Sequence, residues 1–249
     1  MEPLNSSTRF VSQTQFGQYK SISLSKTEIT DASIEPLSSL PNLVRLDILD
    51  GKITDRGLAK IADMKQLTSL NFFRCADITD NGVMQLVQLG SLQRLFLNNN
   101  PQLTRNVVPA VSTLQDLRRL EMDEIKLTTA DVAQLSKLKK LQTLGISGSG
   151  IDDEAAAQLS SMTALRSLSI GGAAITDAGL AKLKRLTGLQ ELSVSENAIT
   201  DRGLMELAEM RSLVSLDVSG PQITDKVMDS WQRYFRRRSS SHWRPAAAS

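Results

Sequence analysis

The phrase "AITDAGLAKLKRLTGLQELSV" at residues 174–194 decides the fold, because close copies of it recur along the chain. "AITDRGLMELAEMRSLVSLDV" follows at residues 198–218, and "KITDRGLAKIADMKQLTSLNF" occupies residues 52–72. Each copy joins Ile-Thr-Asp-x-Gly-Leu to a segment whose leucines alternate with polar residues. Self-similarity at a fixed period is typical of repeat architectures, so the period is the first property to establish.

The repeats follow one another without a gap when each is aligned on the first leucine of Leu-x-x-Leu-x-Leu. Their spacing is 24 or 25 residues, and the two longer repeats carry their extra residue in "CADIT" (75–79) and "NPQLT" (100–104). An insertion at that position lies in a loop and leaves the strand register unchanged. Nine repeats cover residues 19 to about 235, and they begin at Tyr19, Leu43, Leu67, Leu92, Leu117, Leu141, Leu165, Leu189 and Leu213.

Each repeat combines a strand pattern with a helix pattern. In "LQELSV" the alternation places Leu192 and Val194 on one face and Glu191 and Ser193 on the other, as in a β-strand with one buried side. The following segment changes to helical spacing, with a single apolar stripe formed by Ile199, Leu204, Leu207 and Met210. One such unit cannot bury its apolar face alone, so neighbouring repeats must stack.

The Thr-Asp pair before each helix is an N-cap signal, since threonine and aspartate oxygens accept hydrogen bonds from free backbone N–H groups. The pattern leaves open whether Thr200 or Asp201 is the cap. The glycine that follows is expected to let the helix approach its strand closely. It recurs at Gly57, Gly82, Gly179 and Gly203.

These motifs resemble the leucine-rich repeat family, in particular its ribonuclease-inhibitor and F-box-associated style and the bacterial repeat proteins rich in "ITDAGL". The resemblance implies an α/β solenoid, a right-handed βα horseshoe with nine parallel strands on the concave face and helices on the convex face. The asparagine that the family places in the turn after the strand is present only at Asn100 and Asn197. Other residues fill that position elsewhere: Thr27, Gly51, Cys75, Ile125, Ser149, Ala173 and Pro221.

Three segments organise the chain: an N-terminal arm or cap at 1–18, the repeat domain at 19–235, and a basic tail at 236–249 that we expect to be disordered. The repeat domain should end in a capping helix that includes Trp231. Proline is tolerated only in the first turn of a helix. Pro36 and Pro109 therefore predict shorter or 3₁₀-like segments in repeats one and four.

Composition bounds the class of protein. The 249 residues carry a net charge of +2, but residues 232–249 hold five arginines and no acid, so the remainder has a net charge of −3. Cys75 is the single cysteine, which excludes an internal disulfide. No apolar run reaches the roughly 18 residues of a membrane span, and the N-terminus lacks the apolar region of a signal peptide. We therefore expect a cytoplasmic monomer.

The sequence offers few residues for catalysis. His242 is the single histidine and stands in the tail, so the repeats contain no imidazole base that would activate Cys75. Asp152 and Asp153 occupy the capping position and are expected to be structural. No phosphate-binding loop or metal-ligand spacing is present, so we predict that the protein is not an enzyme and binds neither cofactor nor metal.

The outward strand positions differ between repeats, and those of repeats two to five predict a binding surface. Repeats six to nine present mainly serine and glycine there. In-register stacking places Leu49 beside Phe73 and Phe96 diagonal to Phe73, and aromatic side chains flanked by arginines are typical of interface hot spots. We predict that a protein or peptide binds this surface through Arg45, Asp47, Leu49, Asn71, Phe73, Arg74, Arg94, Phe96, Asn98, Arg119, Glu121 and Asp123.

Alternative interpretations stay open at this point. Phe73 and Phe96 merely cover their neighbours in one of them, while Arg74 with Asp50 and Arg119 with Glu121 form exposed ion pairs of little energetic value. In another, the small residues of repeats six to nine admit a peptide backbone or a carbohydrate. The resemblance to F-box-associated repeats implies a further possibility, substrate recognition within a larger ubiquitin-ligase-like or effector assembly.

The tail "RYFRRRSSSHWRPAAAS" (233–249) raises a separate possibility, because arginines interleaved with aromatic residues are typical of segments that bind nucleic acid or anionic membranes. Such binding would weaken steeply with salt, unlike binding to the strand surface.

Overall fold

The computed structural model describes residues 20–26, 28–227 and 229–231, which fall into two compact units, Met1–Met122 and Asp123–Ser249. We call them the N-terminal unit and the C-terminal unit and describe each by itself. The arm at 1–18, the start of repeat one at Tyr19 and the tail at 236–249 lie outside the described residues.

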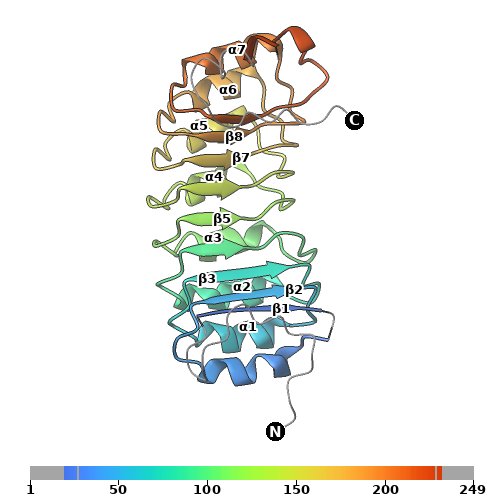
Figure 1. Ribbon diagram of the computed structural model, residues 1–249, viewed down its shortest axis with the longest axis vertical. Coiled ribbons are helices and arrows are strands. Elements are labelled where there is room, and N and C mark those ends of the chain that lie inside the picture. Colours follow the sequence, from blue (N-terminus) through green and yellow to red (C-terminus); the bar gives the residue numbers. More distant parts are fainter. Residues whose placement is uncertain (1–19, 27, 228, 232–249) are drawn as a thin grey trace. The chain divides into compact units, whose positions relative to one another are not determined.

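The N-terminal unit is a stack of short parallel strands alternating with helices (Figure 1). Its strands are β1 (Ser21–Ser25), β2 (Arg45–Leu49), β3 (Ser69–Phe73), β4 (Arg94–Phe96) and β5 (Arg119–Glu121). Its helices are the 3₁₀ turns η1 (Asp31–Ser33), η2 (Glu35–Ser39), η3 (Leu86–Gln88) and η4 (Arg105–Val107), and the α-helices α1 (Asp55–Ala62), α2 (Asp80–Gln85) and α3 (Val108–Val111).

The C-terminal unit repeats the same plan. Its strands are β6 (Thr143–Gly145), β7 (Ser167–Ser169), β8 (Glu191–Ser193) and β9 (Ser215–Asp217). Its helices are α4 (Thr129–Leu135), α5 (Asp153–Leu159), α6 (Asp177–Leu183), α7 (Asp201–Glu206) and the 3₁₀ turn η5 (Leu207–Glu209).

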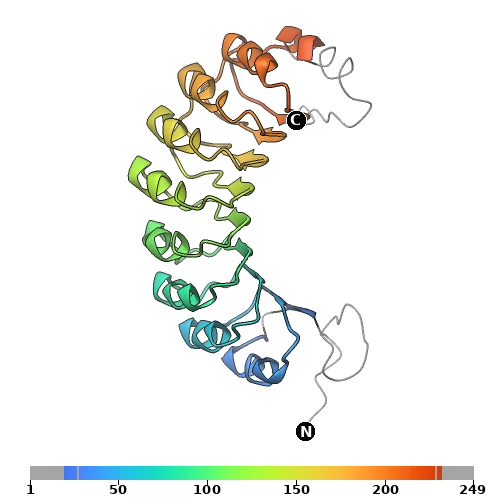
Figure 2. The ribbon, with the colours of Figure 1, turned by 90° about the vertical axis from the view of Figure 1, so that its left-hand side faces the viewer.

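Strands form one face and helices the opposite face of each unit (Figure 2). The strands pair in parallel and in chain order, β1 to β5 in one unit and β6 to β9 in the other. We call the outward side of the strands the strand face. The predicted α/β repeat architecture is therefore confirmed, with one strand for each of the nine repeats among the described residues.

The core of each unit is built from the inward leucines. Leu43, Leu46, Leu67 and Leu70 are wholly buried in the N-terminal unit, as are Leu165 and Leu189 in the C-terminal unit. Burying a leucine side chain stabilises a fold by about 2 kcal/mol. The same positions recur every 24 or 25 residues, so each repeat contributes its leucines to a core shared with its neighbours.

The recurring Thr-Asp pair links successive repeats. Thr200 is the N-cap of α7, because its side chain accepts a hydrogen bond from the backbone N–H of Arg202. Asp201 is the first helical residue, and its carboxylate accepts hydrogen bonds from the backbone and hydroxyl of Thr224 in the next repeat, at 2.8 and 2.6 Å. Threonine therefore caps its own helix, while aspartate fixes the cap of the following one.

We call this arrangement the Thr–Asp ladder, and both units contain it. Each step joins the carboxylate of one aspartate to the N–H and hydroxyl of the next threonine. The steps are Asp31–Thr54, Asp55–Thr79 and Asp80–Thr104 in the N-terminal unit, and Asp153–Thr176, Asp177–Thr200 and Asp201–Thr224 in the C-terminal unit.

The recurring glycine has a different cause from the one expected. A Cβ atom at Gly57 would lie 2.5 Å from Oδ1 of Asp31, the ladder carboxylate of the preceding repeat. A Cβ at Gly82, Gly179 or Gly203 would lie closer still to the equivalent aspartate. Glycine therefore makes room for the ladder between repeats, rather than for the strand of its own repeat.

The pattern of the ladder changes between residues 105 and 152. Arg105 and Thr129 stand where the other repeats carry the ladder aspartate. Thr128 is instead satisfied within its own helix, because its N–H and hydroxyl donate to the carboxylate of Asp131 in a capping box. Asp152 replaces threonine as the cap of α5 and accepts from the N–H of Ala155, which lowers its pKa. The structural role predicted for this carboxylate is confirmed.

The two prolines act as predicted. Among its described residues, repeat one has the 3₁₀ turns η1 and η2 and no α-helix, and Pro36 lies in the first turn of η2. Repeat four carries η4 and the four-residue helix α3, with Pro109 in its first turn. Trp231, proposed as part of the C-terminal cap, is 2% exposed.

Candidate functional site

The strand face of the N-terminal unit brings the predicted apolar residues together. Leu49 pairs in register with Phe73, while Phe96 pairs with Asn71 and so lies diagonal to Phe73, as the spacing predicts. The side chains of Leu49, Phe73 and Phe96 are half-buried. The rings thus combine contact with their neighbours and an accessible outer surface.

Arginine guanidinium groups lie over both rings. The Cζ atom of Arg74 is 4.9 Å from the ring centroid of Phe73, and that of Arg119 is 5.4 Å from the centroid of Phe96. Cation–π contacts at this distance are worth about 0.5–1 kcal/mol at exposed sites. The arginines therefore hold the rings in place.

The same two arginines also form ion pairs with carboxylates. Nε of Arg74 lies 2.6 Å from Oδ1 of Asp50, and a terminal guanidinium nitrogen of Arg119 lies 2.6 Å from Oε1 of Glu121. Both ion pairs of the alternative interpretation are thus present, and each belongs to the same cluster as an aromatic ring.

Arg45 and Asp47 form the third ion pair of this face. Nε of Arg45 donates to both carboxylate oxygens of Asp47, at 2.9 and 3.2 Å. Asp47 is only 7% exposed, so its contribution to a binding surface is to orient Arg45.

Arg94 and Asn98 complete the site on β4 and just after it. Nε of Arg94 donates to the hydroxyl of the buried Ser69 at 3.2 Å, and Arg94 has no acidic partner among the described residues. Asn98 donates to Oε2 of Glu121 at 3.2 Å. We call the set Arg45, Leu49, Asn71, Phe73, Arg74, Arg94, Phe96, Asn98, Arg119 and Glu121 the aromatic–arginine cluster.

Asp123 differs from the other predicted site residues. It belongs to the C-terminal unit, where its carboxylate accepts a hydrogen bond from the backbone N–H of Ser147 at 2.7 Å. This contact fixes the turn after the strand in the next repeat, so the structure gives Asp123 a backbone-positioning role.

Left-handed backbone at the end of the strands is a feature that the sequence analysis missed. Asp50, Arg74 and Asn99 have φ angles of 57°, 54° and 60°, although none is glycine. Glycine occupies the equivalent position in repeats six and seven, as Gly148 and Gly172 with φ angles of 70° and 60°. Alignment of those glycines with Asp50 and Arg74 is the signal that reveals this geometry.

The strand face of the C-terminal unit is small and polar. Its hydroxyls bond one another or nearby carboxylates: Ser147 with Ser169 at 2.8 Å, and Ser193 with Asp217 at 2.8 Å. Gly145 and Gly171 add no side chains to the same face. This surface has no aromatic ring and no arginine among the described outward strand positions.

Cys75 is structural. Its thiol is buried and donates to the carbonyl oxygen of Ile48 in the preceding repeat at 3.5 Å, and burial raises its pKa. Asn100 occupies the equivalent position in the next repeat. Its side-chain amide donates to Phe72 O and Leu97 O, and its Oδ1 accepts from Cys75 N–H. The cysteine therefore replaces one asparagine donor of the turn.

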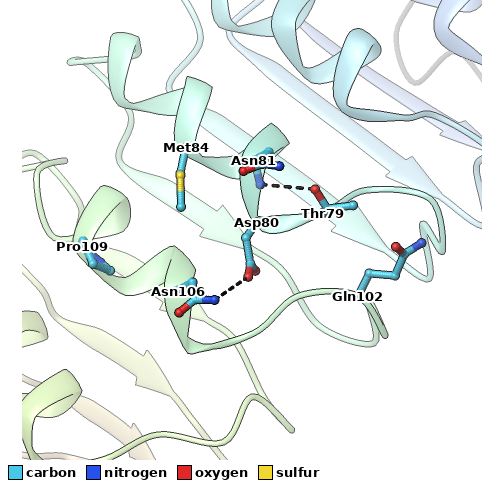
Figure 3. A pocket seen from close by; sticks show the side chains of 7 residues that line it. All are labelled: Thr79, Asp80, Asn81, Met84, Gln102, Asn106 and Pro109. Carbon is cyan, nitrogen blue, oxygen red and sulfur yellow. Dashed lines mark hydrogen bonds between the residues drawn. The ribbon is translucent and has the colours of Figure 1, made fainter.

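An open pocket of about 600 Å³ lies on the helix face of the N-terminal unit (Figure 3). Within it, the Asp80 carboxylate accepts from both Thr104 and Asn106, so ladder contacts occupy this acid. This pocket was not predicted from the sequence, and it is lined by Thr79, Asp80, Asn81, Met84, Gln102, Asn106 and Pro109.

Two further observations concern ligands and membranes. Among residues 20–26, 28–227 and 229–231, no group of three or more histidine, cysteine, aspartate or glutamate side chains is arranged to hold a metal ion. In the same part of the chain, none of the helices has the length and apolar character needed to cross a membrane. His242 and the basic tail lie outside it.

The repeat architecture is shared with known proteins. A family model for the leucine-rich repeat region matches residues 14–247. The crystal structure of internalin C2 from Listeria monocytogenes strain 4b F2365 is similar with a TM-score of 0.64 and 25% sequence identity, over 80% of each chain. An internalin (inlF) of the same strain has a TM-score of 0.52 and 18% identity, over 86% of this chain and 70% of the internalin.

Proposed function

The chain belongs to the leucine-rich repeat family, and from that premise we propose that it is a non-enzymatic interaction module that binds a protein or peptide through its aromatic–arginine cluster. Folds of this kind commonly serve as protein-interaction modules. The observation that carries the proposal is the pair of phenylalanine rings on the strand face, each half-buried and each covered by an arginine.

The chemistry of the cluster favours a protein partner. Aromatic residues and arginine are enriched among the few residues that dominate binding energy at interfaces. A side chain that is already fixed before binding loses little conformational entropy when the partner arrives. Arg74 and Arg119 are fixed in this way by Asp50 and Glu121, so the cluster is preorganised.

The one thiol supports the non-enzymatic part of the proposal. A cysteine nucleophile needs an accessible thiolate, which a lowered pKa supplies. Cys75 has the opposite properties, since its side chain is buried and its pKa is raised.

Affinity capture from an extract of the source organism tests the proposal. The wild-type chain should retain a partner that Phe73→Ala/Phe96→Ala loses at least tenfold, because the double substitution removes both rings. Ser169→Ala/Ser193→Ala, on the strand face of the C-terminal unit, is the matched control and should retain the partner.

Loss of packing must be separated from loss of contact, since the rings are half-buried. Phe73→Leu/Phe96→Leu keeps an apolar side chain at both positions and should fold with a thermal midpoint near that of wild type. It should nevertheless bind the partner more weakly than wild type, because both aromatic rings are gone. Equal capture by wild type and both phenylalanine variants would refute the proposed surface.

A further inference from the structure

The cluster contains one positive charge that the protein itself leaves uncompensated. Three of its arginines have carboxylate partners: Arg45 with Asp47, Arg74 with Asp50, and Arg119 with Glu121. Arg94 is exposed, and no acid among the described residues forms an ion pair with it. Its partner inside the protein is the neutral hydroxyl of Ser69.

The register places Arg94 at the centre of the cluster. It pairs with Ser69 on β3 and with Arg119 on β5, so one of the two neighbouring strands carries an arginine at this level. Strand neighbours are about 4.8 Å apart. Glu121 offsets the charge of Arg119, so the positive charge that attracts an incoming anion at this level is that of Arg94.

The ring of Phe96 lies next to this charge. Phe96 is two residues after Arg94 on β4, so both side chains project from the same face. Phe73 and Leu49 extend the apolar surface along the following row of the sheet. An anionic group bound to Arg94 is therefore accompanied by an apolar group that contacts the phenylalanine rings.

We infer that the cluster binds an extended peptide segment in which an aspartate or glutamate stands beside an aromatic or large aliphatic residue. The carboxylate pairs with Arg94, and the apolar side chain packs on Phe96 and Phe73. Charge complementarity favours a carboxylate over a phosphate, because phosphate groups are typically bound by clusters of arginines, whereas Arg94 is the one arginine of the cluster without a carboxylate partner among the described residues. This inference rests on the proposed function and specifies its partner class.

Selection from a displayed library of random 12-residue peptides on the immobilised full-length chain tests the inference. The enriched sequences should share an acidic residue within two positions of an aromatic or aliphatic one. For a synthetic peptide of the enriched sequence, Arg94→Glu should weaken binding at least tenfold. Arg202→Glu makes the same charge change on the helix face and should alter the dissociation constant less than twofold.

A reciprocal charge swap is the decisive arm. Changing the peptide's acidic residue to lysine should abolish binding to wild type and restore measurable binding to Arg94→Glu. Replacing the same residue by phosphoserine should not strengthen binding to wild type, and a gain of tenfold or more would overturn the choice of carboxylate.

The outcomes separate the two levels of the account. Peptides that depend on Phe96 but lack acidic residues, and that bind Arg94→Gln as tightly as wild type, would overturn the acidic-peptide inference and leave the proposed surface standing. Peptides that bind equally to wild type and Phe73→Leu/Phe96→Leu, or no enrichment at all, would overturn both.

Discussion

The strand faces of the two units differ sharply although the structure beneath them is the same. On β2 to β5 of the N-terminal unit, arginines, acids and phenylalanines stand among the outward strand positions; in the C-terminal unit, serines and glycines predominate there, beside Thr143, Glu191 and Asp217. Both units share inward leucines, threonine caps and ladder aspartates.

This comparison separates two classes of residue. The inward and ladder positions maintain the stack, so a change there should have the same cost in either unit. The outward strand positions contribute little to the stack, so their chemistry is free to serve binding, and a change there should affect one unit alone. The following predictions test this separation, from the largest expected effect to the smallest.

Replacing the turn asparagines Asn100 and Asn197 should lower the free energy of unfolding most, and by the same amount in both units. Asn100→Ala removes three hydrogen bonds and leaves Cys75 N–H and the carbonyls of Phe72 and Leu97 without this partner. Since unsatisfied buried polar groups are costly, we expect a loss of about 3 kcal/mol in the free energy of unfolding. Asn197→Ala removes equivalent bonds in the C-terminal unit and should cost the same.

Urea unfolding followed by circular dichroism measures both losses. Asn81→Ala is the control, because the Asn81 side chain is exposed, and it should change the free energy of unfolding by less than about 0.5 kcal/mol. A difference of more than about 1.5 kcal/mol between the two buried asparagines would show that the units do not share one framework.

Alanine substitution of the ladder glycines should lower the free energy of unfolding by the next largest amount. Alanine at Gly57 or Gly179 gains about 1 kcal/mol of helix propensity but displaces the preceding aspartate, so we expect a net loss of about 1–2 kcal/mol in the free energy of unfolding. Gly90→Ala is the control, since a Cβ there meets no atom within 4 Å.

A double-mutant cycle shows whether the aspartate is the cause. In an Asp31→Ala background, Gly57→Ala should become neutral or stabilising, because the clashing carboxylate is gone. An unchanged cost in that background would point to another origin, such as packing against Ile53, whose Cβ would lie 3.4 Å away.

Left-handed positions should distinguish the two units. Glu196→Gly, at φ 57°, loses one exposed hydrogen bond from Ser219 but should stabilise the C-terminal unit by about 0.5–1 kcal/mol, because glycine tolerates this backbone without strain. Arg74→Gly relieves the same strain at φ 54° but loses the Asp50 ion pair and the Phe73 contact, so its thermal midpoint should stay near that of wild type. Equal stabilisation by both would mean that the arginine contacts contribute nothing to folding.

Low pH should change stability least, through the exposed Asp201–Thr224 step of the ladder. Hydrogen bonds from Thr224 lower the pKa of Asp201, the largest cause being the Thr224 hydroxyl. A lowered folded-state pKa contributes stability that is present above the unfolded value near 3.8 and is lost as pH falls through the folded value. Asp201→Ala should therefore unfold at lower urea than wild type at pH 6, and at the same urea at pH 2. A difference that persists at pH 2 would exclude the charged form as its source.

The repeat period, the strand register and the apolar core follow from the sequence because they depend on spacing. Nine aligned leucine patterns fix which residues face inward, and the register of Leu49 with Phe73 follows directly. The short helices at Pro36 and Pro109 were equally predictable, since proline restricts the backbone wherever it stands.

The roles of the ladder and of Asp123 were harder to predict because they depend on contacts between repeats. The sequence did not distinguish Thr200 from Asp201 as the cap, since both side chains accept hydrogen bonds. In the structure the Asp201 carboxylate binds Thr224 of the next repeat, which leaves Thr200 as the cap. Asp123 looked like an outward strand residue, but a backbone N–H in the next repeat binds its carboxylate. The stacking of Arg119 on Phe96 depends on side-chain rotamers that spacing does not fix.

Photocrosslinking tests the central claim most directly, because it reports which strand face touches the partner. Benzoylphenylalanine at position 96 keeps the phenyl ring of Phe96 and extends it by a photoreactive benzoyl group, and the same residue at position 193 samples the serine face of the C-terminal unit. With the selected acidic peptide, the account predicts a covalent adduct from position 96 and none from position 193. An adduct from position 193 alone, or equal adducts from both positions, would contradict it.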